Sequence, residues 1–184
     1  MSSPKNQFFN RFLFGGGVLL DLCKWVIFAA VLLVIVHKFW FTIFVVDGLS
    51  MEPTIHDKEL VVLKRFGTAT NVQRGDVLAV KYPGDPDHKK YIKRVIGLPG
   101  EKISISDGKV YINNSIHEEN YIPFGVITEP NGDNKEWQLS TNEYFLMGDN
   151  RPGSNDSRYF GPIEKRFFLG KATTVIYPRF LELK

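Results

Sequence analysis

The sequence predicts a mostly β protein, with an N-terminal transmembrane helix followed by an antiparallel β-sheet domain. Three observations predict this fold. One apolar stretch near the N-terminus is long enough to cross a bilayer, short aromatic and β-branched runs recur through the rest of the chain, and turn-forming residues separate those runs. With 184 residues, of which 43% are hydrophobic and 23% charged, the chain can bury one sizeable core.

The apolar stretch from Val18 to Val36 predicts the helix. At a rise of about 1.5 Å per residue it spans roughly 28 Å, close to the hydrocarbon core of a bilayer at about 30 Å. Its two charged residues, Asp21 and Lys24, are three apart near one end, where they can pair and where a lysine can reach the membrane interface.

Two other interpretations of this stretch stay open. The uncharged part, Trp25 to Val36, is short enough for a buried core helix, and Lys5 and Arg11 could begin a cleavable signal peptide. We favour an uncleaved anchor, because little chain precedes it to form a burying domain and no A-x-A site follows it. Lys5 and Arg11 favour a cytoplasmic N-terminus, although Lys38 lies just beyond the span.

The expected organisation is therefore a cytoplasmic segment at 1–17, an anchor at 18–38 and an extracytoplasmic β-rich domain at 39–184. Asp107-Gly108 between two alternating runs is the clearest hairpin signal, whereas Pro123 to Asn142 is the most loop-like stretch. The expected strands are Phe39 to Val46, Leu60 to Leu63, Val77 to Val80, Tyr91 to Ile96, Lys102 to Ile105, Val110 to Ile112, Tyr144 to Met147 and Ala172 to Tyr177.

Composition excludes several classes of function. The formal net charge of +3 is too small and too dispersed for a nucleic-acid-binding surface. The single cysteine, Cys23, excludes an intrachain disulfide framework and a cysteine-based zinc site. His117-Glu118-Glu119 lacks the second histidine of a zinc-protease helix, so we expect no metal and no cofactor.

Three polar segments carry candidate chemistry. Ser50 follows a strand, in a turn between Gly48 and Pro53, where it can act as a nucleophile or only bond its own backbone. A buried, neutral lysine can serve as its base, and Lys93 and Arg94 stand on opposite faces of one strand, so periodicity does not choose which points inward. An exposed lysine is the commoner case.

The third segment runs from Gly148 to Gly161, directly after an apolar strand. So many small polar residues usually form a solvated loop, but here the preceding strand can support an ordered network. Asp156 can pair with Arg158, and Ser154 or Ser157 can bond a neutral amine.

Together these segments resemble the type I (leader) signal peptidases, membrane-bound serine proteases with a Ser-Lys dyad. The likeness covers about residues 39–178, and the compact size is similar to that of the short single-anchor bacterial forms. It rests on Ser50-Met51-x-Pro53-Thr54, on Tyr91-x-Lys93-Arg94-Val95-Ile96-Gly97-Leu98-Pro99-Gly100-Glu101, and on Gly148-Asp149-Asn150-Arg151-x-x-Ser154-x-Asp156-Ser157-Arg158-x-x-Gly161.

The resemblance implies that Ser50 is the nucleophile and Lys93 the general base, a role closed to an arginine because it stays protonated. It implies that Ser154 hydrogen-bonds the Lys93 amine and that Asp156 and Arg158 brace the loop. The Ser50 N–H would contribute to the oxyanion hole. Some relatives carry a serine two residues before the nucleophile, and this chain departs from them with Gly48.

The implied substrates are secretory precursor proteins, cut after small-x-small signals such as A-x-A at the outer face of the bacterial plasma membrane. Phe44, Met51 and Ile55 are candidate pocket residues or lipid contacts. The implied partners are thus signal peptides and membrane lipid, without nucleic acid. Two other functions stay open: a self-cleaving repressor-type Ser-Lys protease, which would carry a DNA-binding module in place of the anchor, and a membrane-tethered, non-catalytic β module that binds peptides or envelope proteins.

Overall fold

The structure is a computed structural model that describes residues 20–34, 41–65, 71–82, 84–87 and 89–183. The chain divides into two units, Met1–Trp40 and Phe41–Lys184. In the first unit, residues 20–34 form a helix in which Lys24 Nζ donates to Asp21 Oδ1 at 3.0 Å, the pair that the sequence predicts.

Across the described ranges, no helix combines the length and the apolar character that crossing a membrane requires. The predicted cytoplasmic segment at 1–17 lies outside the described residues. So do both ends of the predicted anchor, residues 18–19 and 35–38.

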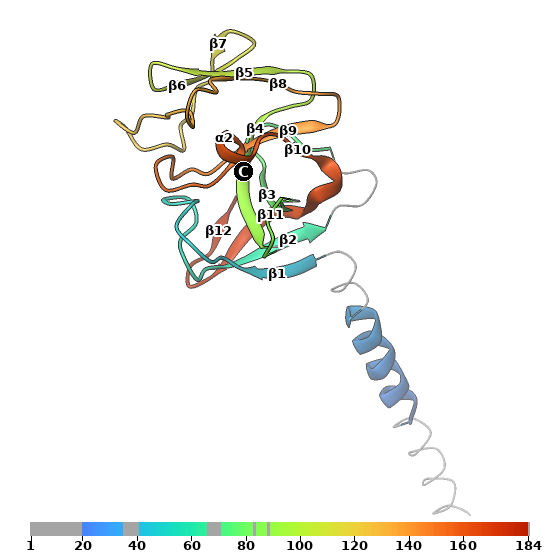
Figure 1. The fold of residues 1–184 in the computed structure, drawn as a ribbon. Helices are drawn as coiled ribbons and strands as arrows, with labels where there is room; N and C mark the ends of the chain where they lie inside the picture. The colour runs from blue at the N-terminus through green and yellow to red at the C-terminus, as the bar shows by residue number, and fades with distance from the viewer. Residues whose placement is uncertain (1–19, 35–40, 66–70, 83, 88, 184) are drawn as a thin grey trace, which may run out of the picture. The chain divides into compact units, whose positions relative to one another are not determined.

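The second unit contains two antiparallel sheets, which Figure 1 shows one above the other. In the described part of the chain, the larger sheet has the order β1 (Phe41–Val45), β2 (Leu60–Arg65), β11 (Phe168–Tyr177), β3 (Val77–Lys81), β4 (Lys90–Gly97), β9 (Glu143–Met147) and β10 (Ile163–Glu164), and β12 (Leu181–Glu182) pairs with β11. The smaller sheet has the order β7 (Ser115–Ile116), β6 (Lys109–Ile112), β5 (Lys102–Ser106) and β8 (Glu136–Gln138). A short helix, α2 (Ser157–Phe160), and a 3-10 turn, η1 (Lys165–Phe167), follow β9.

The larger sheet is buried on both faces, because alternate residues of β3 belong to different cores. Val77 and Ala79 pack in one cluster with β2 and β11, whereas Leu78 and Val80 pack in another with β9. This two-sided burial explains why β3 is a continuous apolar run. A third cluster joins the two sheets, where Trp137 of β8 lies 4.7 Å from Phe145 of β9 between ring centroids.

Within the described residues the eight predicted strands are confirmed, and so is the predicted hairpin between β5 and β6; positions 39 and 40 of the first predicted strand lie outside those residues. Ser106 pairs with Lys109, and Asp107 and Gly108 have φ of 51° and 73°, the left-handed pair that a tight hairpin turn requires. The sequence missed β7, β8, β10, β12 and α2. These elements are two to four residues long, too short to carry a recognisable period, and β8 lies inside the stretch predicted as loop.

Candidate active site

Ser50 lies in a turn shortly after β1, and the loop that follows β9 holds the backbone of this turn. Asn150 N donates to Ser50 O at 3.1 Å, and Asn150 Nδ2 donates to Leu49 O at 3.0 Å. On the other side, Gly48 N donates to Asp57 Oδ1 at 2.7 Å. Gly48 has φ of 107°, a left-handed conformation that favours glycine. This backbone conformation explains why glycine stands at the position where some relatives carry a serine.

Lys93 is directed at this serine. Its Nζ donates to Ser50 Oγ at 2.7 Å and to Ile92 O at 3.0 Å, and only 2% of the residue is exposed. Burial lowers the pKa of the Lys93 amine to about 8, against an opposing effect of Asp156 and Asp149, which raise it. At pH 7 about a tenth of the amine is therefore uncharged and able to accept a proton, and about half is uncharged at pH 8.

The choice between Lys93 and Arg94, which periodicity left open, is made by their partners. Arg94 Nε and Nη2 donate to the two Asp149 carboxylate oxygens at 2.8 and 2.6 Å, and Thr54 Oγ1 donates to the same carboxylate at 2.5 Å. Arg94 and Asp149 are both buried. Sequence reasoning assigned no role to Asp149 or Thr54, although both stand within the motifs quoted above. Their proximity depends on strand pairing that the motifs do not encode.

The loop after β9 approaches the nucleophile closely. A Cβ on Gly148 would collide with Ser154 Oγ and with Ser50 O, so only glycine fits at this position. Asp156 Oδ2 accepts a hydrogen bond from Gly148 N at 3.0 Å, and Arg158 Nε and Nη2 each donate to Asp156 at 2.8 Å. The expected pair of Asp156 and Arg158 is therefore present, and Asp156 also caps α2.

Ser154 differs from the expectation. It is buried, but its Oγ has no hydrogen-bond partner among the residues that the structure describes, so the predicted bond to the Lys93 amine is not formed. Lys93 lies in β4 and Ser154 in the loop after β9, so only the tertiary packing decides how the two side chains meet.

A cleft of about 410 Å³ borders the Ser50 and Lys93 side chains. Phe44, Asp47 and residues 89–93 line it together with Ser50. Phe44, a candidate pocket residue, thus lies at the cleft. Met51 and Ile55 do not line it, because both are fully buried in the core cluster that also contains Ile92. An apolar side chain suits a core and a pocket equally well, so only the tertiary structure shows that Met51 and Ile55 belong to the core.

Within the described residues, no cluster of three or more His, Cys, Asp or Glu side chains could hold a metal ion. Next to the Ser50 hydroxyl lies the buried amine of Lys93. This arrangement can activate a hydroxyl for attack on a carbonyl.

Comparisons with known proteins agree on one family. The family model described as signal peptidase, peptidase S26, matches residues 19–177. The signal peptidase I of Bacillus licheniformis is 35% identical over 168 residues, which cover 87% of this chain and 89% of that protein. The signal peptidase IB of Staphylococcus aureus is 33% identical over 182 residues, with coverage of 89% and 93%. The crystal structure of a signal peptidase I from Enterococcus faecalis is 30% identical, with a TM-score of 0.47, covering 56% of this chain and 98% of that one.

Proposed function

The chain belongs to the signal peptidase family, peptidase S26, and on this premise we propose that it removes signal peptides from secretory precursor proteins with Ser50 as nucleophile and Lys93 as general base. The observation that carries the assignment is the 2.7 Å contact between Lys93 Nζ and Ser50 Oγ, made by a lysine that is 2% exposed. An uncharged amine at hydrogen-bond distance from a hydroxyl is the geometry that general-base activation of a serine requires.

In the proposed reaction, neutral Lys93 accepts the Ser50 proton while Ser50 Oγ attacks the scissile carbonyl carbon. The Ser50 N–H donates to the oxygen that becomes negative. Lys93 then returns the proton to the departing amine of the mature protein. Water, deprotonated by the same lysine, hydrolyses the acyl ester and regenerates Ser50.

We assign the loop after β9 a supporting role. Ser154 Oγ is buried without a partner beside the close contact of Gly148 with Ser50 O, which suits a hydroxyl that orients the Lys93 amine when substrate is bound. The Asp156 and Arg158 pair braces this loop from the other side.

The substrate would bind as an extended strand. Only the second half of β4 pairs with β9, from Arg94 onward, so Lys90 to Lys93 keep a free edge next to Ser50. β1 is the terminal strand of the larger sheet and offers another edge. Backbone bonds to such edges position an extended peptide, while the apolar lining formed by Phe44 and Ile92 accepts small side chains.

We further propose a single-pass plasma-membrane protein, with an anchor at 18–38, a cytoplasmic N-terminus and residues 39–184 outside. Its support is an apolar rim on the second unit. Val45 of β1 and Tyr177 of β11 both stand opposite Leu60 of β2, and both are more than half exposed. Exposed apolar surface of this kind is typical of membrane contact. The apolar rim consists of Phe41, Ile43, Val45, Ile176, Tyr177 and Phe180.

The test is cleavage of a precursor with an A-x-A site by the detergent-solubilised full chain. We expect Ser50→Ala and Lys93→Ala to abolish cleavage, whereas Ser115→Ala and Lys135→Ala, at exposed positions, leave it unchanged. The wild-type rate should rise with pH and level off above pH 8, because the pKa of Lys93 is about 8. Cleavage by Lys93→Ala would exclude the lysine as base, and an inactive wild type would favour the tethered binding module.

A further inference from the structure

Glu119 lies outside the three motifs, in the segment that follows β7 of the smaller sheet, yet it reaches the loop that packs against Ser50. Its carboxylate binds the guanidinium of Arg151 through both oxygens: Nη1 donates to Oε2 at 2.8 Å, and Nη2 donates to Oε1. Arg151 is 1% exposed, and Glu119 is nearly buried. A buried guanidinium needs such a partner, because an unpaired charge in the interior is strongly unfavourable.

Arg151 also bonds the backbone beside the active site. Its Nε donates to Gly148 O at 3.1 Å, and Gly148 is the residue whose Cα closely approaches Ser50 O. The residue before Arg151, Asn150, bonds the Ser50 and Leu49 carbonyls. One arginine therefore joins the segment after β7 to the loop residues that hold the nucleophile.

The carboxylate of Glu119 is itself held in place. Tyr121 Oη donates to Glu119 Oε1 at 2.7 Å, and the Tyr121 ring lies 4.2 Å from the Arg94 guanidinium carbon. Arg94 in turn binds Asp149 of the same loop. Glu119 and Tyr121 thus contact both arginines that hold the loop's first residues.

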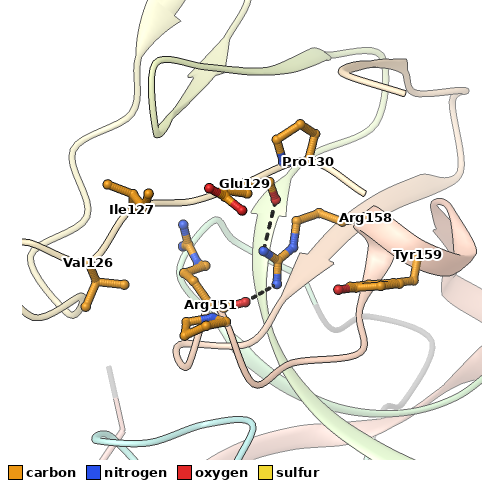
Figure 2. A pocket seen from close by; sticks show the side chains of 8 residues that line it. Val126, Ile127, Glu129, Pro130, Arg151, Arg158 and Tyr159 are labelled. Atoms are coloured by element: carbon orange, nitrogen blue, oxygen red, sulfur yellow. Dashed lines mark hydrogen bonds between the residues drawn. The ribbon is translucent and has the colours of Figure 1, made fainter. Parts of the chain in front are cut away.

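A second link runs parallel to the first. Figure 2 shows the Arg158 guanidinium between the Glu129 carbonyl, at 3.2 Å, and the Arg151 carbonyl, at 2.7 Å. The three residues that make these contacts line a cavity of about 390 Å³ between residues 126–130 and the loop after β9. The loop is therefore attached to the connection between β7 and β8 through a side chain, Glu119, and through a backbone carbonyl, that of Glu129.

We propose that Glu119 is a positioning residue of the peptidase reaction, which acts through Arg151 to hold the loop after β9 against Ser50 and Lys93. This inference rests on the proposed function for its catalytic consequence, but not for its structural one. It gives the smaller sheet, which supplies neither Ser50 nor Lys93, a part in the chemistry.

The test is Glu119→Gln in the full chain, with Glu136→Gln as its matched control. Glu136 is also a carboxylate of the smaller sheet, but its partner is Lys102, at an exposed position. We expect kcat for precursor cleavage to fall by about 10- to 100-fold in Glu119→Gln, with KM changed little, because a small misplacement of reacting groups costs rates of that order. Glu136→Gln should match the wild type.

A pH profile separates positioning from general loss of folded protein. Asp156 and Asp149, both on this loop, raise the pKa of Lys93, whereas Arg158 lowers it. A displaced loop changes both the burial and the charges around Lys93 and therefore shifts the rising limb of the rate along the pH axis, while partial unfolding lowers the rate at every pH without moving the limb. In a double-mutant cycle, Glu119→Gln should add no further loss of kcat to Arg151→Met.

Hydrogen exchange supplies a readout that needs no cleavage. Glu119→Gln should speed amide exchange in residues 148–156 and leave β5 and β6 unchanged, even if the chain proves inactive. If Glu119→Gln unfolds the protein, Thr128→Val removes another bond to Arg151 without leaving a charge unpaired and should act in the same direction. If a folded Glu119→Gln variant has the same kcat, the same pH dependence of the rate and the same amide exchange as the wild type, the proposal is wrong.

Discussion

Replacing Lys93 with methionine should abolish cleavage and at the same time stabilise the folded protein. Lys93 is 2% exposed, and its pKa falls from 10.5 to about 8 on burial. The Lys93 amine is therefore harder to protonate in the folded state than in the unfolded chain. Methionine has a similar, unbranched shape and carries no charge to bury.

The magnitude follows from the two pKa values. At pH 7 the shift from 10.5 to about 8 costs the folded wild type about 3 kcal/mol, and at pH 10 it costs about 1 kcal/mol. Methionine removes this cost but also loses the hydrogen bonds to Ser50 and Ile92, which together contribute on the order of 1 kcal/mol. Lys93→Met should therefore be more stable than the wild type by about 2 kcal/mol at pH 7 and nearly equal to it at pH 10.

The most discriminating part of this prediction is the direction in which the free energy of unfolding changes with pH. A base with a depressed pKa binds fewer protons in the folded state between pH 8 and 10.5, so wild-type stability rises with pH across that window. Lys93→Met should show no such rise. The exposed Lys90→Met variant is the control, since its stability should follow the wild type.

The free energy of unfolding would be measured by urea titration of the detergent-solubilised chains, followed by far-ultraviolet circular dichroism, at pH 7 and pH 10. A Lys93→Met variant that is destabilised at pH 7, or whose difference from the wild type is the same at both pH values, would refute the argument that burial lowers the pKa of Lys93.

Three further predictions follow from other contacts. Gly148→Ala should inactivate the peptidase and lower its melting temperature, because the new Cβ would collide with Ser154 Oγ and Ser50 O; wild-type activity would contradict that contact. Arg179→Met removes the hydrogen bonds that, against burial, lower the pKa of Glu59, so it should cost about 1–3 kcal/mol of stability near pH 7 in urea titrations. That difference should shrink as the pH falls below about 4.5, where Glu59 protonates in the unfolded chain. Serine substitutions in the apolar rim should reduce the fraction of the second unit that sediments with lipid vesicles, and an unchanged fraction would exclude the rim as a membrane contact.

The strands could be read from the sequence because their information is local. Alternating aromatic and β-branched residues bounded by turn residues predict a strand wherever they occur, and Asp107-Gly108 predicts its hairpin for the same reason. β8 was missed because three residues carry no period, and its place is decided by pairing with β5 and by Trp137 packing on Phe145.

Ser50 and Lys93 could be named from the sequence only through the resemblance of three ordered motifs to a known family, because each residue alone is a weak signal. Their contact spans 43 positions, and no spacing rule predicts a contact of that kind. Tertiary packing therefore decides that Lys93, rather than Arg94, meets the serine. It also decides that Met51 belongs to the core and that Glu119, 32 positions from Arg151, reaches the loop beside the nucleophile. Local patterns specify which segments form strands, but burial and ion pairing depend on which distant segments the fold brings together.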